Sequence, residues 1–322
     1  MASHLAHITN RAVSVVIPTF NHVCVPLVRR LAAQARACGL AADSFEIIVA
    51  DDASTDAAVR RANRAVAQCP GCHLVELPHN IGRSAIRNLL CREARHEYLL
   101  YLDSDVLPLR GDFLLSYLKE QDNADGVVCG GVALPESAAM ARHNLRYRYE
   151  SACLEKFSPA HRQAAPYRGF RSTNFMVRRE VMEALPFDER VRHYGFEDVL
   201  WGKALAEHGV AVRHTDNPVL VDDFEPNDLF LDKTDEGLRT LSTIEGQMRG
   251  YSGLVALSDR LAQLRLRGAA SGAFSLVRPL LRRTLCSGRP SVLLYNVYRA
   301  GRFIELRKSY RNHTRPKGKS DK

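Results

Sequence analysis

The sequence Tyr98-Leu-Leu-Tyr-Leu-Asp103-Ser-Asp105-Val-Leu107 decides the fold of this chain. Its first five residues have large apolar side chains and are too few for a helix, so they predict a strand buried on both faces. The strand ends at two carboxylates, Asp103 and Asp105. Because Asp is almost never fully buried unless it is paired, these side chains need solvent, a hydrogen-bond donor or a cation. Mg²⁺, which takes one or two protein carboxylates together with substrate phosphates, is one such cation.

Two earlier segments have the same pattern, an apolar run followed by polar residues. The runs are residues 13–17 and 45–50, and the residues after them include Pro18, Thr19, Asn21, Asp51 and Asp52. Segments with helical periodicity separate the runs. This alternation predicts an α/β fold with a mostly parallel sheet sandwiched by helices, in which ligands bind at the carboxyl ends of the strands. An Asp-x-Asp sequence alone also fits a solvated turn. The polar residues after all three strands are expected at the same edge of the sheet, however, and this favours a binding site.

Later segments predict further local structure. Ser54 or Thr55 is expected to cap the helix that follows the second strand. Residues 139–156 are expected to form one helix, whose basic face is either solvated or binds an acceptor or phosphate. Gly195 allows a turn before another helix, which has Glu197 and Asp198 in its first turn. Acidic residues at that position either complement the helix dipole or belong to a site.

The composition is that of a globular protein with an anionic partner. The chain has 322 residues, 46% of them hydrophobic, and a net charge of +9. No apolar run approaches the roughly 20 residues that cross a bilayer, and no signal-type apolar core is present, so we expect a cytoplasmic protein. The eight cysteines are scattered, and Cys69-Pro-Gly-Cys72 is expected to be a structural turn rather than a zinc site, which needs four ligands.

Four blocks of sequence resemble the family 2 glycosyltransferases, which have the nucleotide-diphosphosugar transferase fold of the GT-A type. The blocks are residues 16–21 (Val-Ile-Pro-Thr-Phe-Asn), 49–56 (Val-Ala-Asp-Asp-Ala-Ser-Thr-Asp), 102–105 (Leu-Asp-Ser-Asp) and 195–198 (Gly-Phe-Glu-Asp). Residues 80–88, the stretch from 216 to 239 and residues 290–295 resemble one bacterial branch of the family. Together these segments cover most of the chain in the order of the family, which is more specific than any single motif.

The resemblance implies an enzyme of cell-envelope polysaccharide synthesis. It would move a sugar from a nucleotide-diphosphate sugar, with a UDP-sugar as the first candidate, to a hydroxyl of a glycan or lipid-linked acceptor, without a nucleic acid partner. The residues that it implies for nucleotide binding are Pro18, Thr19, Asn21, Asp51, Asp52, Arg83, Asp103 and Ser104. Asp198, with Glu197 beside it, is implied to be the catalytic base. One carboxylate that acts as a base, without a second as nucleophile, implies inversion.

The resemblance also implies a cofactor, Mg²⁺ or Mn²⁺, bound by Asp103 and Asp105. Such an ion neutralises the charge that develops on the leaving diphosphate. The related branch has a His ligand soon after an Asn-Pro turn, where this chain has Val221. His214 precedes this position, and Asp222 and Asp223 follow it. We expect either that Asp222 completes the metal site or that the site is weaker than in relatives.

The alternation of strands and helices ends near residue 225, which predicts three parts of the chain. Residues 1–225 are expected to form the glycosyltransferase catalytic domain, 226–310 a helical C-terminal extension with breaks at 250–253, 268–272 and 287–290, and 311–322 a basic disordered tail. Leucines and arginines between Arg278 and Arg302 resemble a basic amphipathic surface. It is expected either to make peripheral contact with the inner face of the cell membrane or to close over the catalytic domain.

Two other classes of function fit parts of the sequence. A phosphohydrolase of the haloacid dehalogenase type would use Asp103 and Asp105 in catalysis and Asp222-Asp223 at its metal. Its nucleophile strand usually opens the domain, however, whereas about a hundred residues precede it here. A non-enzymatic basic binding protein would not explain the acidic residues at the strand ends.

Overall fold

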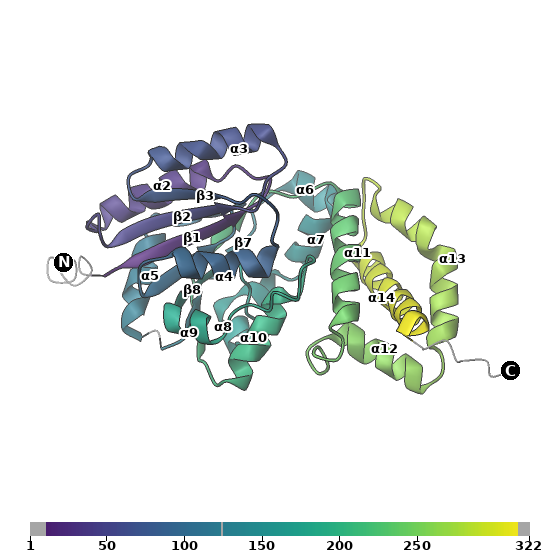
Figure 1. The fold of residues 1–322 in the computed structure, drawn as a ribbon. Helices are drawn as coiled ribbons and strands as arrows, with labels where there is room; N and C mark the ends of the chain where they lie inside the picture. The colour runs from purple at the N-terminus through teal and green to yellow at the C-terminus, as the bar shows by residue number, and fades with distance from the viewer. Residues whose placement is uncertain (1–10, 124, 315–322) are drawn as a thin grey trace. The chain divides into compact units, whose positions relative to one another are not determined.

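The computed structural model describes residues 11–123 and 125–314, which form two units (Figure 1). The sheet unit contains the described residues within 1–136, together with 153–192 and 197–223. The helical unit contains residues 137–152, 193–196 and 224–314. The main boundary therefore falls between Asp223 and Phe224, while two short segments from the earlier part of the chain belong to the helical unit.

The sheet unit is built on a seven-stranded sheet, counted over its described residues, with the order β3-β2-β1-β4-β8-β6-β9. The strands are β1 (Val13–Thr19), β2 (Phe45–Asp51), β3 (Cys72–Glu76), β4 (Tyr98–Leu102), β6 (Val127–Cys129), β8 (Asn174–Arg178) and β9 (Val212–His214). Strand β8 is antiparallel to both of its neighbours, β4 and β6, and the other pairs are parallel. The predicted mostly parallel sheet is confirmed, although the sequence pattern did not predict the direction of β8.

Helices cover both faces of this sheet, because the central strands are apolar on both sides. The helices are α2 (Val25–Ala37), α3 (Ala57–Asn63), α4 (Arg83–Glu93), α5 (Phe113–Glu120), α8 (Pro159–Ala164), α9 (Arg179–Ala184) and α10 (Glu197–Glu207). One buried cluster joins strand residues Val16, Leu99 and Tyr101 to α4 residues Ile86 and Leu90. Since side chains alternate along a strand, the equally buried Val15 and Ile17 face the opposite side of the sheet.

A second, three-stranded sheet lies beside the end of β4. It contains β5 (Val106–Pro108), β10 (Val219–Val221) and β7 (Val132–Ala133), in the order β5-β10-β7. Strand β5 begins directly after Asp105, and β10 ends directly before Asp222. The two strands are antiparallel, with Val221 opposite Val106. This small sheet therefore determines where both carboxylates lie.

The helical unit has a core of its own. Its helices are α6 (Ala138–His143), α7 (Leu145–Ser151), α11 (Asn227–Thr243), α12 (Gly253–Gln263), α13 (Arg267–Leu285) and α14 (Val292–Thr314). The core cluster contains Leu145, Leu231, Phe274, Leu285, Tyr295 and Tyr298. Across residues 11–314, no helix combines the length and the apolar composition that crossing a membrane requires.

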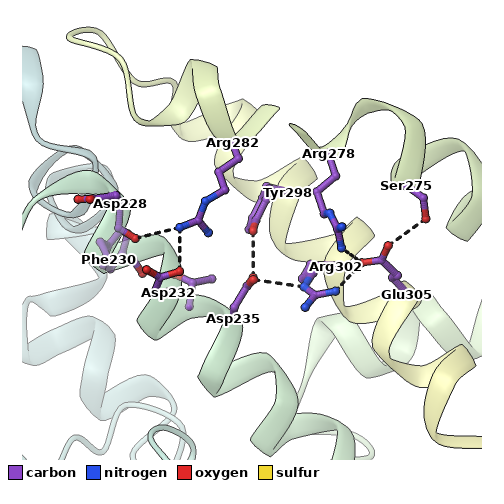
Figure 2. A network of polar contacts seen from close by, with 11 residues as sticks. Asp228, Phe230, Asp232, Asp235, Ser275, Arg278, Arg282, Tyr298, Arg302 and Glu305 are labelled. Carbon is purple, nitrogen blue, oxygen red and sulfur yellow. Dashed lines mark hydrogen bonds and ion pairs between the residues drawn. The ribbon is translucent and has the colours of Figure 1, made fainter. Parts of the chain in front are cut away.

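Ion pairs link α11, α13 and α14 of the helical unit (Figure 2). Arg282 donates to Asp232 at 2.7 Å, and Arg278 donates to Glu305 at 2.9 Å. Arg302 reaches both Asp235 and Glu305. The arginines that suggested a membrane-binding surface are therefore paired, at least at positions 278, 282 and 302, with acidic groups of neighbouring helices.

Three details differ from the sequence-based expectations. Residues 139–156 do not form one helix, because Asn144 has an extended backbone and its side chain caps α7 by accepting from the Tyr147 amide at 2.8 Å. The cap of α3 is Asp56 rather than Ser54 or Thr55. The expected break at 268–272 lies within α13, since glycine in a helix costs only about 1 kcal/mol.

The first residues of the predicted tail also differ from the expectation. Helix α14 continues to Thr314, so residues 311–314 are helical. The rest of the predicted tail, 315–322, lies outside the described residues.

The crossing of α13 and α14 predicts opposite effects for two glycine substitutions. A Cβ at Gly301 would lie 2.1 Å from the buried Phe274 ring, whereas a Cβ at Gly272 would meet no atom within 4 Å. Gly301→Ala should lower the free energy of unfolding, because overpacking costs about 1–3 kcal/mol and exceeds the helix-propensity gain. Gly272→Ala should raise it by up to about 1 kcal/mol. Chemical denaturation of both variants measures this, and equal stability would contradict the packing described.

Candidate active site

Three neighbouring parallel strands end at one edge of the sheet unit. Strand β1 lies between β2 and β4, and its last residue, Thr19, is paired with Asp51 of β2. Asp103 follows β4, and its amide donates to the carbonyl of Thr173 at 3.0 Å, just before the antiparallel β8 begins. The loops that carry the predicted nucleotide-binding residues are thus side by side.

Asn21 joins the loops after β1 and β2. Its backbone has a φ of 53°, in the left-handed region that Asn tolerates better than most residues. Its side-chain oxygen accepts from the amides of Thr55 and Asp56 at 2.8 and 3.0 Å. Its backbone N–H donates to the Ser54 hydroxyl at 2.7 Å. The residue therefore fixes the shape of both loops at the edge of the sheet.

Asp51 and Asp52 are buried and bind main-chain amides. Asp51 accepts from the Ser54 amide at 2.8 Å. The two oxygens of Asp52 accept from the amides of Ile81 and Gly82 at 2.7 and 3.0 Å, which holds the loop before α4. Burial raises the pKa of Asp52, and these two amides oppose that increase. Both carboxylates therefore organise the loops around the predicted nucleotide site.

Arg87 of α4 lies between two of the predicted site residues. Its side chain is only 2% exposed, and it donates to Asp103 Oδ1 at 2.8 Å. One of its nitrogens lies 3.7 Å from Glu197 Oε1, at the first residue of α10. Arg83, one turn earlier on α4, lies 3.7 Å from the same oxygen and is half exposed. The negative charge of Glu197 is therefore balanced by two guanidinium groups.

Asp198 differs from its neighbour in its surroundings. It is partly exposed and accepts from the Val199 amide at 2.8 Å. The turn that precedes α10 contains two residues with positive φ, Gly195 and Phe196. Burial against protein, and then the charge of Glu197, raise the pKa of Asp198 to about 6. A carboxylate with this pKa is suited to proton transfer near neutral pH.

The register of the small sheet brings Asp105 and Asp222 to one end of a strand pair. Val106 is opposite Val221, so one further step of the antiparallel register places Asp105 opposite Asp222. Asp222 is exposed, and Asp105 is partly exposed. In the part of the chain that the structure describes, Asp103, Asp105 and Asp222 do not form a compact group of three potential ligands.

Val221, which stands at the expected His position, and the earlier His214 are both buried. Val221 belongs to β10 and packs inside the sheet unit. His214 of β9 lies 2.9 Å from an Arg162 nitrogen through Nδ1 and 2.9 Å from the Pro166 carbonyl through Nε2. Burial lowers the pKa of this imidazole. His214 is therefore a structural residue that holds the loop after α8.

A small pocket lies beside Asp103 at the start of β8. Its lining residues are Cys129, Gly131, Val132, Phe157, Arg162, Gly169, Arg171, Thr173 and Asn174. The exposed Arg171 lies over the Phe157 ring at 4.2 Å from its centroid, and its charge acts to lower the pKa of Asp198. From the sequence, Arg87 received no role, and Arg171 was identified only as part of a loop, residues 166–171, that shapes the pocket. Arg87 carried a signal in the block 80–88, where an arginine falls on the apolar side of α4.

The remaining predicted residues lie at the same edge. The Thr19 hydroxyl donates to the His22 carbonyl at 3.1 Å, while Pro18 and Ser104 are partly exposed. The structure thus gathers the predicted residues at the ends of β1, β2 and β4 and at the start of α10 in one region of the sheet unit, together with the predicted Arg83 and the unpredicted Arg87 of α4.

Comparison with known proteins gives one family match. The model of the family described as Glycosyl transferase family 2 matches residues 14–185. No curated protein sequence matches this chain.

Solved structures share the fold at low sequence identity. Residues 1–349 of S. aureus TarS, solved alone and with UDP-GlcNAc, are 16% identical with a TM-score of 0.50, and the match covers 94% of this chain and 92% of that one. The mannosyltransferase PcManGT from Pyrobaculum calidifontis, solved with GDP-Man and Mn²⁺, is 20% identical with a TM-score of 0.50, covering 95% of this chain and 84% of that one.

Proposed function

This chain belongs to glycosyl transferase family 2, and we propose that it transfers a sugar, with inversion, from a nucleotide-diphosphate sugar to a hydroxyl of a glycan or lipid-linked acceptor. One observation carries the proposal. Arg87 contacts both Asp103, at the predicted nucleotide site, and Glu197, next to the predicted base. A residue proposed to bind the donor and the neighbour of the proposed base thus belong to one cluster of the sheet unit.

Asp198 is the proposed base. It would take the proton of the acceptor hydroxyl while that oxygen attacks the anomeric carbon and the nucleoside diphosphate leaves. Glu197 is less suited to this role, because it is 6% exposed and faces two arginines. The raised pKa of Asp198 supports the assignment, since a base works best when its pKa lies near the working pH.

Asp103 and Asp105 are the proposed ligands of Mg²⁺ or Mn²⁺, with Asp222 as a third. Carboxylate oxygens suit these hard ions, which also bind substrate phosphates. The register that places Asp222 opposite Asp105 supports its inclusion. The ion would stabilise the charge on the leaving diphosphate. The loop after β4 would hold the ion through Asp103 and Asp105.

We propose a UDP-sugar as donor, held by the loops after β1 and β2. The test is a screen of UDP- and GDP-sugars for hydrolysis or transfer with Mn²⁺ or Mg²⁺, with heat-inactivated protein as the control. The proposal predicts metal-dependent release of nucleoside diphosphate from at least one sugar nucleotide. The loop 166–171, which contributes Gly169 and Arg171 to the small pocket, is the proposed determinant of sugar specificity.

We also propose that the helical unit touches the inner face of the membrane, through its exposed leucines rather than its paired arginines. Leu276 and Leu280 lie one turn apart on α13 and are 84% and 67% exposed. Arg283, on the same face of the helix, is also exposed. Apolar side chains beside a basic residue fit an anionic lipid surface.

Substitution of the two acidic residues of α10 tests the proposed base. Asp198→Asn nearly preserves volume and removes basicity, so turnover should fall by about 10²–10⁴-fold. The melting temperature should not fall, because the change removes a carboxylate whose ionised form is disfavoured. Glu197→Gln should reduce turnover much less. If Glu197→Gln were inactive and Asp198→Asn active, Glu197 rather than Asp198 would be the base.

The pH dependence of the rate gives a second reading of the same pair. The base must be ionised, so kcat/KM should fall as the pH drops through about 6, the pKa of Asp198. Glu197→Gln removes the neighbouring negative charge, which lowers the pKa of Asp198. The acidic limb of the pH profile, where kcat/KM falls, should therefore move to lower pH. A limb that stays in place would show that another group titrates.

The metal proposal is tested at Asp105. Asp105→Asn removes one negative charge from the site and should weaken Mn²⁺ and nucleotide-sugar binding together, which calorimetry measures. Asp112→Asn, a substitution of an exposed carboxylate before α5, is the matched control. Full activity of Asp105→Asn in the presence of a chelator would end the proposal.

Membrane contact is tested by placing negative charges on the exposed apolar surface. The double substitution Leu276→Asp and Leu280→Asp should abolish binding to vesicles that contain phosphatidylglycerol, with enzymatic turnover unchanged. Leu109→Asp, at an exposed leucine of the sheet unit, should leave binding unchanged. Wild-type protein that does not sediment with these vesicles at low salt would refute the proposal.

A further inference from the structure

Arg87 lies in the interior of the sheet unit, where a charged side chain is unfavourable unless it is paired. Its residue is 1% exposed, and its guanidinium carbon is 5.6 Å from the centroid of the Phe187 ring. Its backbone carbonyl accepts from the hydroxyl of the buried Tyr101 at 2.9 Å. The side chain and the backbone of this residue are thus both held in place.

We infer that Arg87 is a positioning residue that fixes the loop after β4 relative to the start of α10. The inference rests on the proposed function. One end of its planar guanidinium donates to Asp103 at 2.8 Å, and another nitrogen faces Glu197 at 3.7 Å. Asp103 belongs to the proposed donor site, and Glu197 precedes the proposed base. A rigid, always charged fork can hold two carboxylates at once, which the point charge of lysine does less well.

Charge balance alone does not account for this arrangement. Replacing a buried ion pair with apolar residues is often neutral or stabilising, so a buried Arg–Glu pair is weak evidence for stability. Two buried atoms of this cluster, Arg87 Nε and Glu197 Oε2, also have no hydrogen-bond partner among the described residues. A cluster built for stability would pair both atoms. The cluster instead fits a role in holding Asp103 and Glu197 at a fixed distance and orientation relative to each other.

The consequence is an effect on turnover rather than on donor binding. Without Arg87, Asp103 and the start of α10 would lose their common anchor, and the proposed base would lie less well aligned with the anomeric carbon. Misplacement of a catalytic group by 1 Å can cost about 10²-fold. Arg87→Met should therefore reduce kcat by about 10–10²-fold. The KM for the best sugar nucleotide of the screen should stay within about threefold of wild type.

Arg87→Met leaves the buried Glu197 with only the half-exposed Arg83 as a partner, so loss of folding must be separated from loss of alignment. The single tryptophan, Trp201, supplies the readout. It lies on α10, is 2% exposed, and stacks on Phe187 at 4.8 Å between ring centroids. Its emission therefore reports the packing of α10 against the ring that Arg87 contacts.

The experiment compares four variants by kcat, KM, melting temperature and tryptophan emission. The double variant Arg87→Met with Glu197→Gln removes both charges and should recover the melting temperature and the wild-type emission while kcat stays low. Arg87→Lys should be stable and intermediate in kcat. Arg92→Met, at an exposed arginine of the same helix, should behave as wild type.

The outcomes separate this inference from the proposed function. A wild-type protein without any turnover would refute the proposed function, and with it the reaction that Arg87 is inferred to serve. An active wild type with a double variant of equal kcat would overturn only the positioning role and leave Arg87 as a partner for the charge of Glu197. A raised KM with unchanged kcat in Arg87→Met would overturn it in favour of donor binding.

Discussion

Negative charge at the carboxyl edge of the sheet is the constraint on which the sheet unit depends. The acidic residues gathered there are Asp51, Asp52, Asp103, Asp105, Glu197 and Asp198. Within the neighbouring pairs Asp51/Asp52 and Glu197/Asp198 the negative charges repel one another unless donors or cations hold them. Main-chain amides hold Asp51 and Asp52, and the buried Arg87 holds Asp103 and Glu197. At Asp198, burial and then the charge of Glu197 raise the pKa, and the charges of Arg171 and Arg87 only partly oppose this increase.

The helical unit meets a similar constraint in a different way. Its arginines lie on helices that also carry leucines, and at Arg278, Arg282 and Arg302 the charge is paired with acidic residues of a neighbouring helix (Figure 2). These pairs turn polar faces toward one another, while Leu276 and Leu280 are exposed. A sequence pattern that resembles a basic membrane surface is thus in part a network of ion pairs between helices.

The sequence predicted the elements whose signal is local. The apolar runs of β1, β2 and β4 predicted strands, and the residues that follow them predicted the edge where Asn21, Asp52 and Asp103 lie. Long-range features were out of reach, because the direction of β8 and the small sheet depend on pairing between distant segments. Arg87 was missed because an arginine in a helix is expected to face solvent, and only tertiary structure shows its buried carboxylate partners. The break at Asn144 was missed because its cap depends on one side chain in an otherwise helical pattern.

The stereochemistry of the product tests the central claim most directly. If Asp198 acts as a base for direct displacement, the sugar must reach its acceptor with the anomeric configuration opposite to that of the donor. Proton NMR of the first product formed from an α-linked sugar nucleotide, recorded before the anomers equilibrate, measures this configuration. The account predicts the β-anomer. The α-anomer would contradict it, because retention requires a different arrangement of reacting groups from the single base proposed here.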